Sequence, residues 1–134
     1  MRKKVIAFGT FDKVHPGHIS YLEQAKALGD LIVVIARDKT AEQVKGKKPI
    51  QSEKERKKEI EKLNLAKQVL LGMLNDKYKV IEEVKPDIVA LGYDQKSFTE
   101  HLQEELKKRN IKAKIVRLKP FKEKVYKSSK LNSK

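Results

Sequence analysis

Leu31-Ile32-Val33-Val34-Ile35-Ala36 is an uninterrupted apolar run in which β-branched side chains predominate. A strand inside a parallel sheet is covered on both faces, so it shows a continuous apolar pattern where a half-exposed strand would alternate. The run therefore predicts a buried strand of a parallel sheet.

A strand and a helix are predicted on the N-terminal side of this run. The segment from Lys3 to Gly9 is short, rich in strand formers and ends at a glycine. A helix is expected to begin at Pro16, a favoured first-turn residue, and to stop at Gly29. Its apolar residues recur at helical spacing, at Ile19, Leu22, Ala25 and Leu28.

Strands and helices continue to alternate after the run. A capping box at Ser52-Glu53-Lys54-Glu55 predicts a helix to about Leu63, and a second helix is expected from Phe98 to Arg109, with Asn110 at its end. Tyr78, Ile81 and Val84 share one further helix face, and strands are expected at 68–71, 87–92 and 113–118. The alternation predicts a Rossmann-like, doubly wound α/β fold, a parallel sheet of about five strands with helices on both faces. In such folds ligands bind beyond the carboxyl ends of the strands, at the topological switch point.

Length and composition limit the protein classes that fit. With 134 residues, of which 39% are hydrophobic, the chain is expected to be a single domain over residues 1–134, and its last ten or so residues are candidates for a flexible tail. The absence of cysteine excludes disulfides, thiolate zinc sites, iron–sulfur clusters and a cysteine nucleophile. No segment resembles a signal peptide or reaches membrane-spanning length, so a soluble cytoplasmic protein is expected.

The net charge of +14 is unevenly distributed. Residues 1–105 hold 20 basic and 17 acidic side chains, whereas residues 106–134 hold 12 basic and one acidic. A basic C-terminal part is typical of a nucleic-acid or polyanion surface, of a site for a phosphorylated ligand, or of the lysine-rich surface of some thermophilic proteins.

The stretch from Gly9 to His18, Gly-Thr-Phe-Asp-Lys-Val-His-Pro-Gly-His, carries the chemistry. It joins the first predicted strand to the first predicted helix, where unpaired backbone N–H groups and the helix dipole favour an anion. His15 and His18 share a face there, and Gly17 leaves room for phosphates. The stretch therefore predicts a phosphate-binding site.

Other interpretations of the histidines are weaker. Zinc would need further ligands, yet cysteine is absent and His101 belongs to a separate predicted helix, where it is expected to be a solvated bystander. The P-loop pattern and the dinucleotide glycine fingerprint are both missing, which disfavours kinases, GTPases and NAD enzymes.

The Gly-Thr-Phe-Asp and His-Pro-Gly-His motifs resemble the signature of a nucleotidyltransferase superfamily. It includes glycerol-3-phosphate and phosphoethanolamine cytidylyltransferases and pantetheine-phosphate adenylyltransferase. More narrowly, residues 36–40, 45–50 and 91–95 resemble the archaeal FAD synthases, and the similarity covers nearly the whole chain. The resemblance implies attack of an acceptor phosphate on the α-phosphorus of ATP or CTP, with release of pyrophosphate.

The resemblance also implies roles for individual residues. His15 and His18 would contact the phosphates and stabilise developing charge, and Lys45, in its flexible basic loop, matches the family's mobile lysine. Asp94 would bind the ribose or base or hold Mg²⁺ through water, although an aspartate at a strand end is often only a turn residue or helix cap. The residues implied at the nucleotide are Gly9, Thr10, Phe11, His15, Gly17, His18, Arg56, Gly92, Asp94, Tyr126, Ser128 and Ser129.

The last three of these rest on a partial match. The family's second signature reads Arg-Thr-x-Gly-Ile-Ser-Thr, and residues 126–130 match only its serine-rich end. A frayed tail of lysines and serines is an equally good account of them.

The leading function is transfer of AMP from ATP to FMN, giving FAD and pyrophosphate. The FMN phosphate is largely a dianion at neutral pH, so the reaction needs alignment and charge relief and no general base. Mg²⁺ or another divalent cation is expected, bound mainly through nucleotide phosphates and not by the histidines.

Two alternatives remain. A cytidylyltransferase would use CTP and glycerol 3-phosphate or a similar alcohol phosphate with the same phosphate-handling residues. A basic nucleic-acid-binding protein would need aromatic platforms, yet aromatic residues are 6% of the chain. Neither a membrane nor a nucleic acid is the expected partner, and the family resemblance implies a homodimer.

Overall fold

Five parallel strands form one sheet at the centre of the molecule, in the order β3-β2-β1-β4-β5. The computed structural model describes residues 3–73, 76, 78–92 and 101–119. The strands are β1 (Lys4–Gly9), β2 (Asp30–Ile35), β3 (Gln68–Leu71), β4 (Ile88–Leu91) and β5 (Lys114–Arg117). The strand order reverses between β1 and β4, which makes that boundary the topological switch point. The predicted Rossmann-like doubly wound sheet is confirmed.

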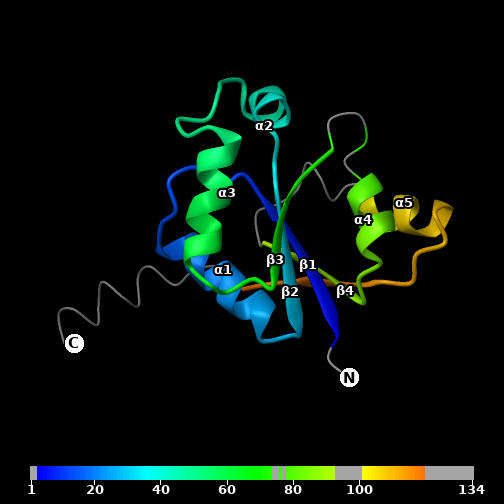
Figure 1. Ribbon diagram of the computed structural model, residues 1–134. Coiled ribbons are helices and arrows are strands. Elements are labelled where there is room, and N and C mark those ends of the chain that lie inside the picture. The colour runs from blue at the N-terminus through cyan, green and yellow to red at the C-terminus, as the bar shows by residue number, and fades with distance from the viewer. Residues whose placement is uncertain (1–2, 74–75, 77, 93–100, 120–134) are drawn as a thin grey trace.

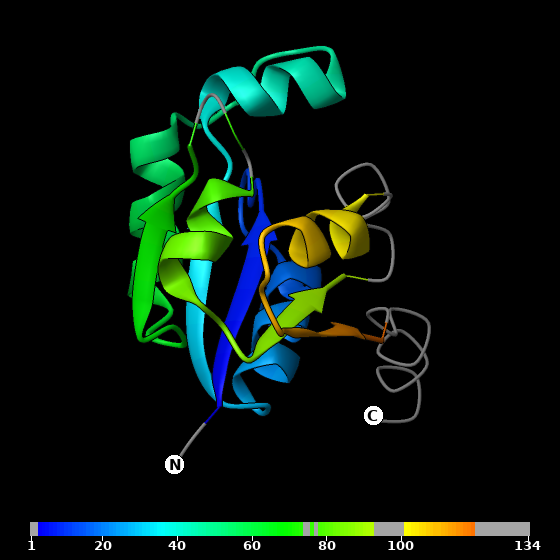
Figure 2. The ribbon, with the colours of Figure 1, turned by 90° about the vertical axis from the view of Figure 1, so that its right-hand side faces the viewer.

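Helices cover both faces of the sheet, as Figures 1 and 2 show. One face carries α1 (Pro16–Lys26) and α3 (Glu53–Lys62), and the other carries α4 (Lys79–Val84) and α5 (Leu102–Lys108). The remaining described helix, α2 (Asp38–Lys45), follows directly after the carboxyl end of β2. This arrangement leaves the carboxyl ends of the strands to be lined by loops.

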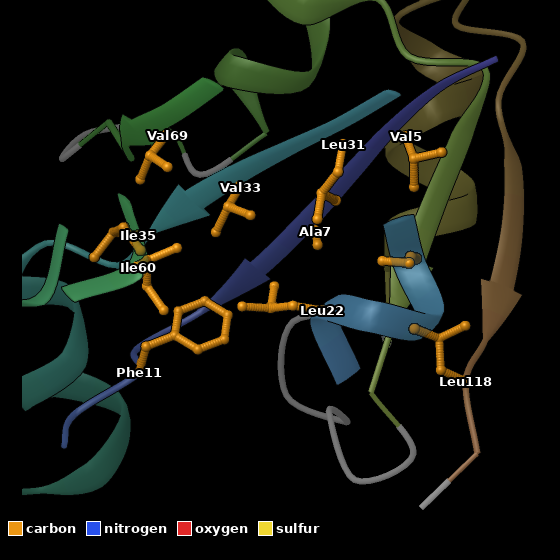
Figure 3. Packing of buried hydrophobic residues seen from close by; sticks show 12 residues of the cluster. Val5, Ala7, Phe11, Leu22, Leu31, Val33, Ile35, Ile60, Val69 and Leu118 are labelled. Atoms are coloured by element: carbon orange, nitrogen blue, oxygen red, sulfur yellow. The ribbon is translucent and has the colours of Figure 1, made fainter. Parts of the chain in front are cut away.

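Two hydrophobic cores, one on each face, explain the apolar run in β2. Leu31, Val33 and Ile35 pack into the cluster beneath α1 and α3, which Figure 3 shows. Ile32 and Val34, the alternate residues, pack into the cluster beneath α4 and α5. Because both faces of β2 are buried, the strand has no polar positions within the run, as predicted.

Gly29 has a different role from the predicted helix stop. Helix α1 already ends at Lys26, with Ala27 as its C-cap. A Cβ atom at Gly29 would lie 2.1 Å from the carbonyl oxygen of Lys3, so only glycine lets this turn pass against the start of β1. Glycine is therefore required at position 29 because the backbone there passes close to the backbone of Lys3, and not because it ends the helix.

The other helix boundaries match the prediction in most places. Helix α3 has the predicted capping box between Ser52 and Glu55. Asn110 ends α5 in a left-handed conformation at φ 57°, and the following N–H, of Ile111, donates to the carbonyl of Leu106. The predicted start of this helix at Phe98 lies outside the described residues.

Arg109 joins α5 to α4 and to the segment before it. Its guanidinium donates to Asp76 at 2.9 Å, to Glu105 at 3.0 Å and to Glu82, and it lies 5.6 Å from the centre of the Tyr78 ring. These contacts raise the pKa of Arg109, with the Asp76 hydrogen bond as the main cause. Burial opposes ionisation of Asp76, yet its bond to Arg109 and a backbone N–H bond from Tyr78 hold the Asp76 pKa below its ordinary value.

In the described part of the chain, no helix combines the length and the apolar character needed to cross a bilayer.

Candidate functional site

The two histidines of the motif form the N-terminus of α1. His15 is the N-cap, and its Nδ1 accepts the N–H of Gly17 at 3.0 Å. The Nδ1 of His18 accepts the N–H of His15 at 3.3 Å, which completes a reciprocal capping box. Because each Nδ1 is an acceptor, a neutral ring carries its proton on Nε2. The cap therefore fixes the tautomer of both neutral rings, with the donor at Nε2.

The histidine rings form part of an aromatic stack. Their centroids lie 3.8 Å apart with an interplanar angle of 21°. Phe11 meets His18 edge-on, at 5.3 Å and 76°, and the Phe11 ring also stacks on Tyr21 at 6.2 Å. The motif thus places two donors side by side at the positive end of a helix dipole.

Phe11 fixes the shape of the loop between β1 and α1. It adopts a left-handed backbone with φ 54°, and its side chain is only 3% exposed. A Cβ atom at Gly9 would lie 2.6 Å from Cζ of this ring, so the glycine makes room for Phe11. The Phe11 side chain therefore belongs to the core, at the end of the cluster near Ile60 in Figure 3. Main-chain contacts of Thr10 and Phe11 with a nucleotide stay a prediction.

Asp12 links this loop to the segment between α2 and α3. Its two carboxylate oxygens accept the N–H groups of Ile50 and Gln51, at 2.8 and 2.9 Å. The Oε1 atom of Gln51 in turn accepts the N–H of Lys13 at 2.8 Å. These contacts, here called the Asp12–Gln51 latch, hold the basic segment 46–50 against the histidine loop. No local sequence pattern predicts these roles of Asp12 and Gln51, because their partners are nearly 40 residues away in the chain.

Arg56 lies beneath the same loop and is fully buried. Its Nη1 donates to the carbonyl of Thr10 at 2.8 Å, its Nε to the carbonyl of Gln51 at 3.2 Å and its Nη2 to Asp38 at 2.7 Å. The guanidinium thus joins the β1–α1 loop, the start of α3 and the start of α2. The predicted contact of Arg56 with a phosphate stays a prediction, and the described geometry gives it a positioning role.

Glu53 supplies the N-terminal cap that α2 lacks in its own sequence. Its Oε1 accepts the N–H of Asp38 at 2.8 Å, and its Oε2 accepts from Arg37 at 3.0 Å. The bond from the Asp38 N–H is the main cause that lowers the pKa of Glu53, and the Arg37 guanidinium adds to it. Arg37 also donates to the carbonyl of Gly72 at 3.3 Å, so this corner ties β2, α2, α3 and the end of β3 together.

Lys45 occupies a different element from the one predicted. The sequence predicts a flexible basic loop at this position, but Lys45 is the last residue of α2, and Gly46 forms a left-handed C-cap at φ 82°. The prediction was wrong because α2 has few apolar residues to mark it and takes its N-terminal cap from another helix. The basic loop therefore starts at Gly46.

The remaining predicted site residues divide into two groups. Gly92 follows β4 at the carboxyl edge of the sheet, where its carbonyl accepts from Arg117 at 2.7 Å. Gly17 is the second residue of α1, and its N–H is engaged by His15. The predicted roles of Asp94, Tyr126, Ser128 and Ser129 lie outside the described residues.

The described residues contain no grouping of three histidine, aspartate or glutamate side chains that could hold a metal ion.

These features define a class of protein. A doubly wound sheet, a Gly-Thr-Phe-Asp loop at the end of β1 and a histidine pair capping α1 are those of a nucleotidyltransferase. The family model described as Cytidylyltransferase-like matches residues 6–133, so the chain belongs to that family and is a nucleotidyltransferase enzyme.

Relatives narrow the family further. The chain is 52% identical over 118 residues to the FAD synthase of Ferroglobus placidus, covering 87% of this chain and 76% of the relative. It is 48% identical over 119 residues to the FAD synthase of Aciduliprofundum boonei, covering 88% and 79%. The chain therefore belongs to the archaeal FAD synthases within the cytidylyltransferase-like family.

A solved structure shares both fold and sequence. The crystal structure of the lipopolysaccharide core biosynthesis protein from Thermoplasma volcanium superposes with a TM-score of 0.84 at 44% identity. The match covers 90% of this chain and 99% of that one.

Proposed function

We propose that the chain transfers AMP from ATP to FMN, giving FAD and pyrophosphate. The observation that carries the proposal is the stacked histidine pair at the N-terminus of α1, in a chain about half identical to FAD synthases. ATP is then the co-substrate and FMN the acceptor.

The chemistry is an in-line displacement at phosphorus. An oxygen of the FMN phosphate attacks the α-phosphorus of ATP, a new P–O bond forms, and the bond to the leaving pyrophosphate breaks. No proton needs to be removed from the acceptor, because its phosphate is largely a dianion at neutral pH. The enzyme therefore has to align two anions and relieve the repulsion between them.

The residues of the site can both align the two phosphates and relieve the repulsion between them. The Nε2–H groups of His15 and His18 donate to phosphate oxygens at the positive end of α1, where charge develops in the transition state. We assign Lys45 the role of a phosphate-binding cation from the family resemblance alone. The Asp12–Gln51 latch holds the segment that follows α2 against the histidine loop. Arg56 holds the Thr10 carbonyl and so fixes the loop that carries the motif.

Mg²⁺ fits this site as a partner of the nucleotide. The ion prefers oxygen ligands and keeps several of its waters, so triphosphate oxygens can hold it without a protein cage. When bound, it neutralises charge on the triphosphate and on the leaving pyrophosphate. The histidines donate through Nε2 in this scheme and are not metal ligands.

The family resemblance leads us to propose, in addition, that the protein is a homodimer and acts in the cytoplasm. Light scattering on the purified chain tests the dimer, and a mass equal to one chain would contradict it.

The function is tested by a substrate panel on the purified chain. With ATP, FMN and Mg²⁺ we expect FAD, detected by chromatography, and an equal amount of pyrophosphate. A second arm offers CTP with glycerol 3-phosphate, because a cytidylyltransferase would use the same phosphate-handling residues. Faster turnover in that arm would make the chain a cytidylyltransferase.

A histidine variant tests the assigned chemistry. His18→Ala should lower kcat by about 100-fold or more, since losing one transition-state donor costs that much in other enzymes. His101→Ala is the matched control, because His101 is exposed and its side chain makes no cap bond to α5. Unchanged turnover in His18→Ala would remove the histidine pair from the mechanism.

A further inference from the structure

Strands β1 and β4 separate at the switch point. Within the described residues they pair from Val5 with Ile88 to Ala7 with Ala90, whereas β1 pairs with β2 as far as Gly9. The two strands therefore form a fork, here defined by Phe8 on β1 and Ala90 on β4, at the edge where ligands bind in this class of fold.

The hydroxyl group of Tyr21 bridges this fork from α1. It lies 2.8 Å from the carbonyl oxygen of Ala90 and 3.3 Å from that of Phe8, and it accepts the N–H of Phe8 at 3.2 Å. A hydroxyl has one proton to donate and two lone pairs, so the shorter contact marks donation to Ala90. A tyrosine hydroxyl is protonated at neutral pH, and burial raises the pKa of Tyr21 further.

The ring of Tyr21 connects the fork to the histidines through Phe11. It stacks on Phe11 at an interplanar angle of 21°, and Phe11 meets His18 edge-on. Phe11 has no room to move toward β1, because even a Cβ atom at Gly9 would collide with it. Tyr21, Phe11 and His18 therefore form one packed row from the fork to the helix cap.

We propose that Tyr21 is a positioning residue for the transfer reaction, which holds the fork through its hydroxyl and orients His18 through Phe11. The proposal rests on the proposed role of His18. The hydroxyl and the ring have separable effects, and two variants distinguish them.

Tyr21→Phe removes only the hydroxyl. One neutral hydrogen bond contributes about 0.5–1.5 kcal/mol, so kcat/KM for ATP should fall about threefold to tenfold. Ala25→Gly, one turn further along α1 and fully buried, is the matched control for loss of helix stability. The control should lower the thermal midpoint without changing kcat/KM at a temperature where the protein stays folded.

Tyr21→Leu removes the stack as well, and it should lower kcat about tenfold. If the ring acts through His18, then in a His18→Ala background the kcat of Tyr21→Leu should be less than twofold below that of Tyr21→Phe. Additive losses in the double variant would overturn the proposal, as would a Tyr21→Phe enzyme with wild-type kcat/KM.

The ring signals of His18 give a readout without substrate. In NMR spectra of the free chain, Tyr21→Leu should shift the His18 ring protons as Phe11 moves, whereas Ala25→Gly should leave them in place. Unmoved His18 signals in Tyr21→Leu would contradict the packed row. A wild-type chain that makes no FAD would instead contradict the proposed function, so the two failures are distinguishable.

Discussion

Replacing Arg56 by methionine tests whether this residue holds the site together. Methionine keeps much of the apolar volume of the side chain and removes its three donated hydrogen bonds. Two of the acceptors are backbone carbonyls, at Thr10 and Gln51, and the third is the carboxylate of Asp38. We expect the variant to lose stability and to loosen the β1–α1 loop.

The magnitude follows from the partners. A hydrogen bond from a charged group contributes about 1.5–3 kcal/mol, and two such bonds end on carbonyls. The ion pair adds at most about 1 kcal/mol, because the side chain of Asp38 is 43% exposed and water can replace its partner. We expect a total loss of about 4 kcal/mol, a large share of the roughly 5–15 kcal/mol that stabilises a typical domain.

Urea unfolding followed by circular dichroism measures this loss. Lys57→Met on the same helix is the matched control. Lys57 pairs with Glu61 at the surface, so this variant should lose less than about 1 kcal/mol of the free energy of unfolding. A loss below about 1 kcal/mol in Arg56→Met would refute the positioning role. If such a stable variant also lost affinity for ATP, Arg56 would act on the phosphate directly, as the family resemblance implies.

Three further perturbations have defined outcomes. Gly9→Ala should displace the Phe11 ring, lower the free energy of unfolding by about 1–3 kcal/mol and raise the KM for ATP. Gly29→Ala, the control, should destabilise the protein without raising this KM. Equal KM values for the two variants in steady-state kinetics would be evidence against a role of Gly9 in shaping the site. Asp12→Asn keeps one acceptor oxygen of the latch, so KM for ATP should rise about fivefold, and an unchanged KM would count against the latch. Glu53→Gln should lower the free energy of unfolding by about 1 kcal/mol at pH 7. Because folding lowers the pKa of Glu53, the stability that its carboxylate contributes is complete above the ordinary pKa and is lost as the pH falls through the folded pKa. A stability difference between the two proteins that does not shrink as the pH is lowered below the ordinary pKa of glutamate, measured by urea titration, would contradict the assignment.

The fold could be predicted because its signals are local. The apolar run of β2 indicates burial on both faces, and the five strands lie within a residue or two of their predicted positions. The capping box at Ser52 lies entirely within one turn, so the sequence alone identifies the start of α3. The histidine pair was also found from the sequence, since both residues belong to one helix start.

The supporting contacts of the site could not be predicted, because they join distant segments. Helix α2 is capped by Glu53, which belongs to α3. In α2 itself, Ala41 is buried in the core. Asp12 contacts residues nearly 40 positions away, and the Tyr21 hydroxyl contacts Ala90. Only the tertiary structure brings these groups together, so a single sequence contains no pattern that reveals them.

Isotopic labelling of the phosphates tests the central claim most directly. The purified chain is incubated with FMN, Mg²⁺ and ATP labelled at either the α- or the γ-phosphorus, and the products are separated. Attack on the α-phosphorus predicts α label in FAD and γ label in pyrophosphate, in equal amounts. Label from the γ-phosphorus in inorganic phosphate, with no α label in FAD, would contradict adenylyl transfer to FMN.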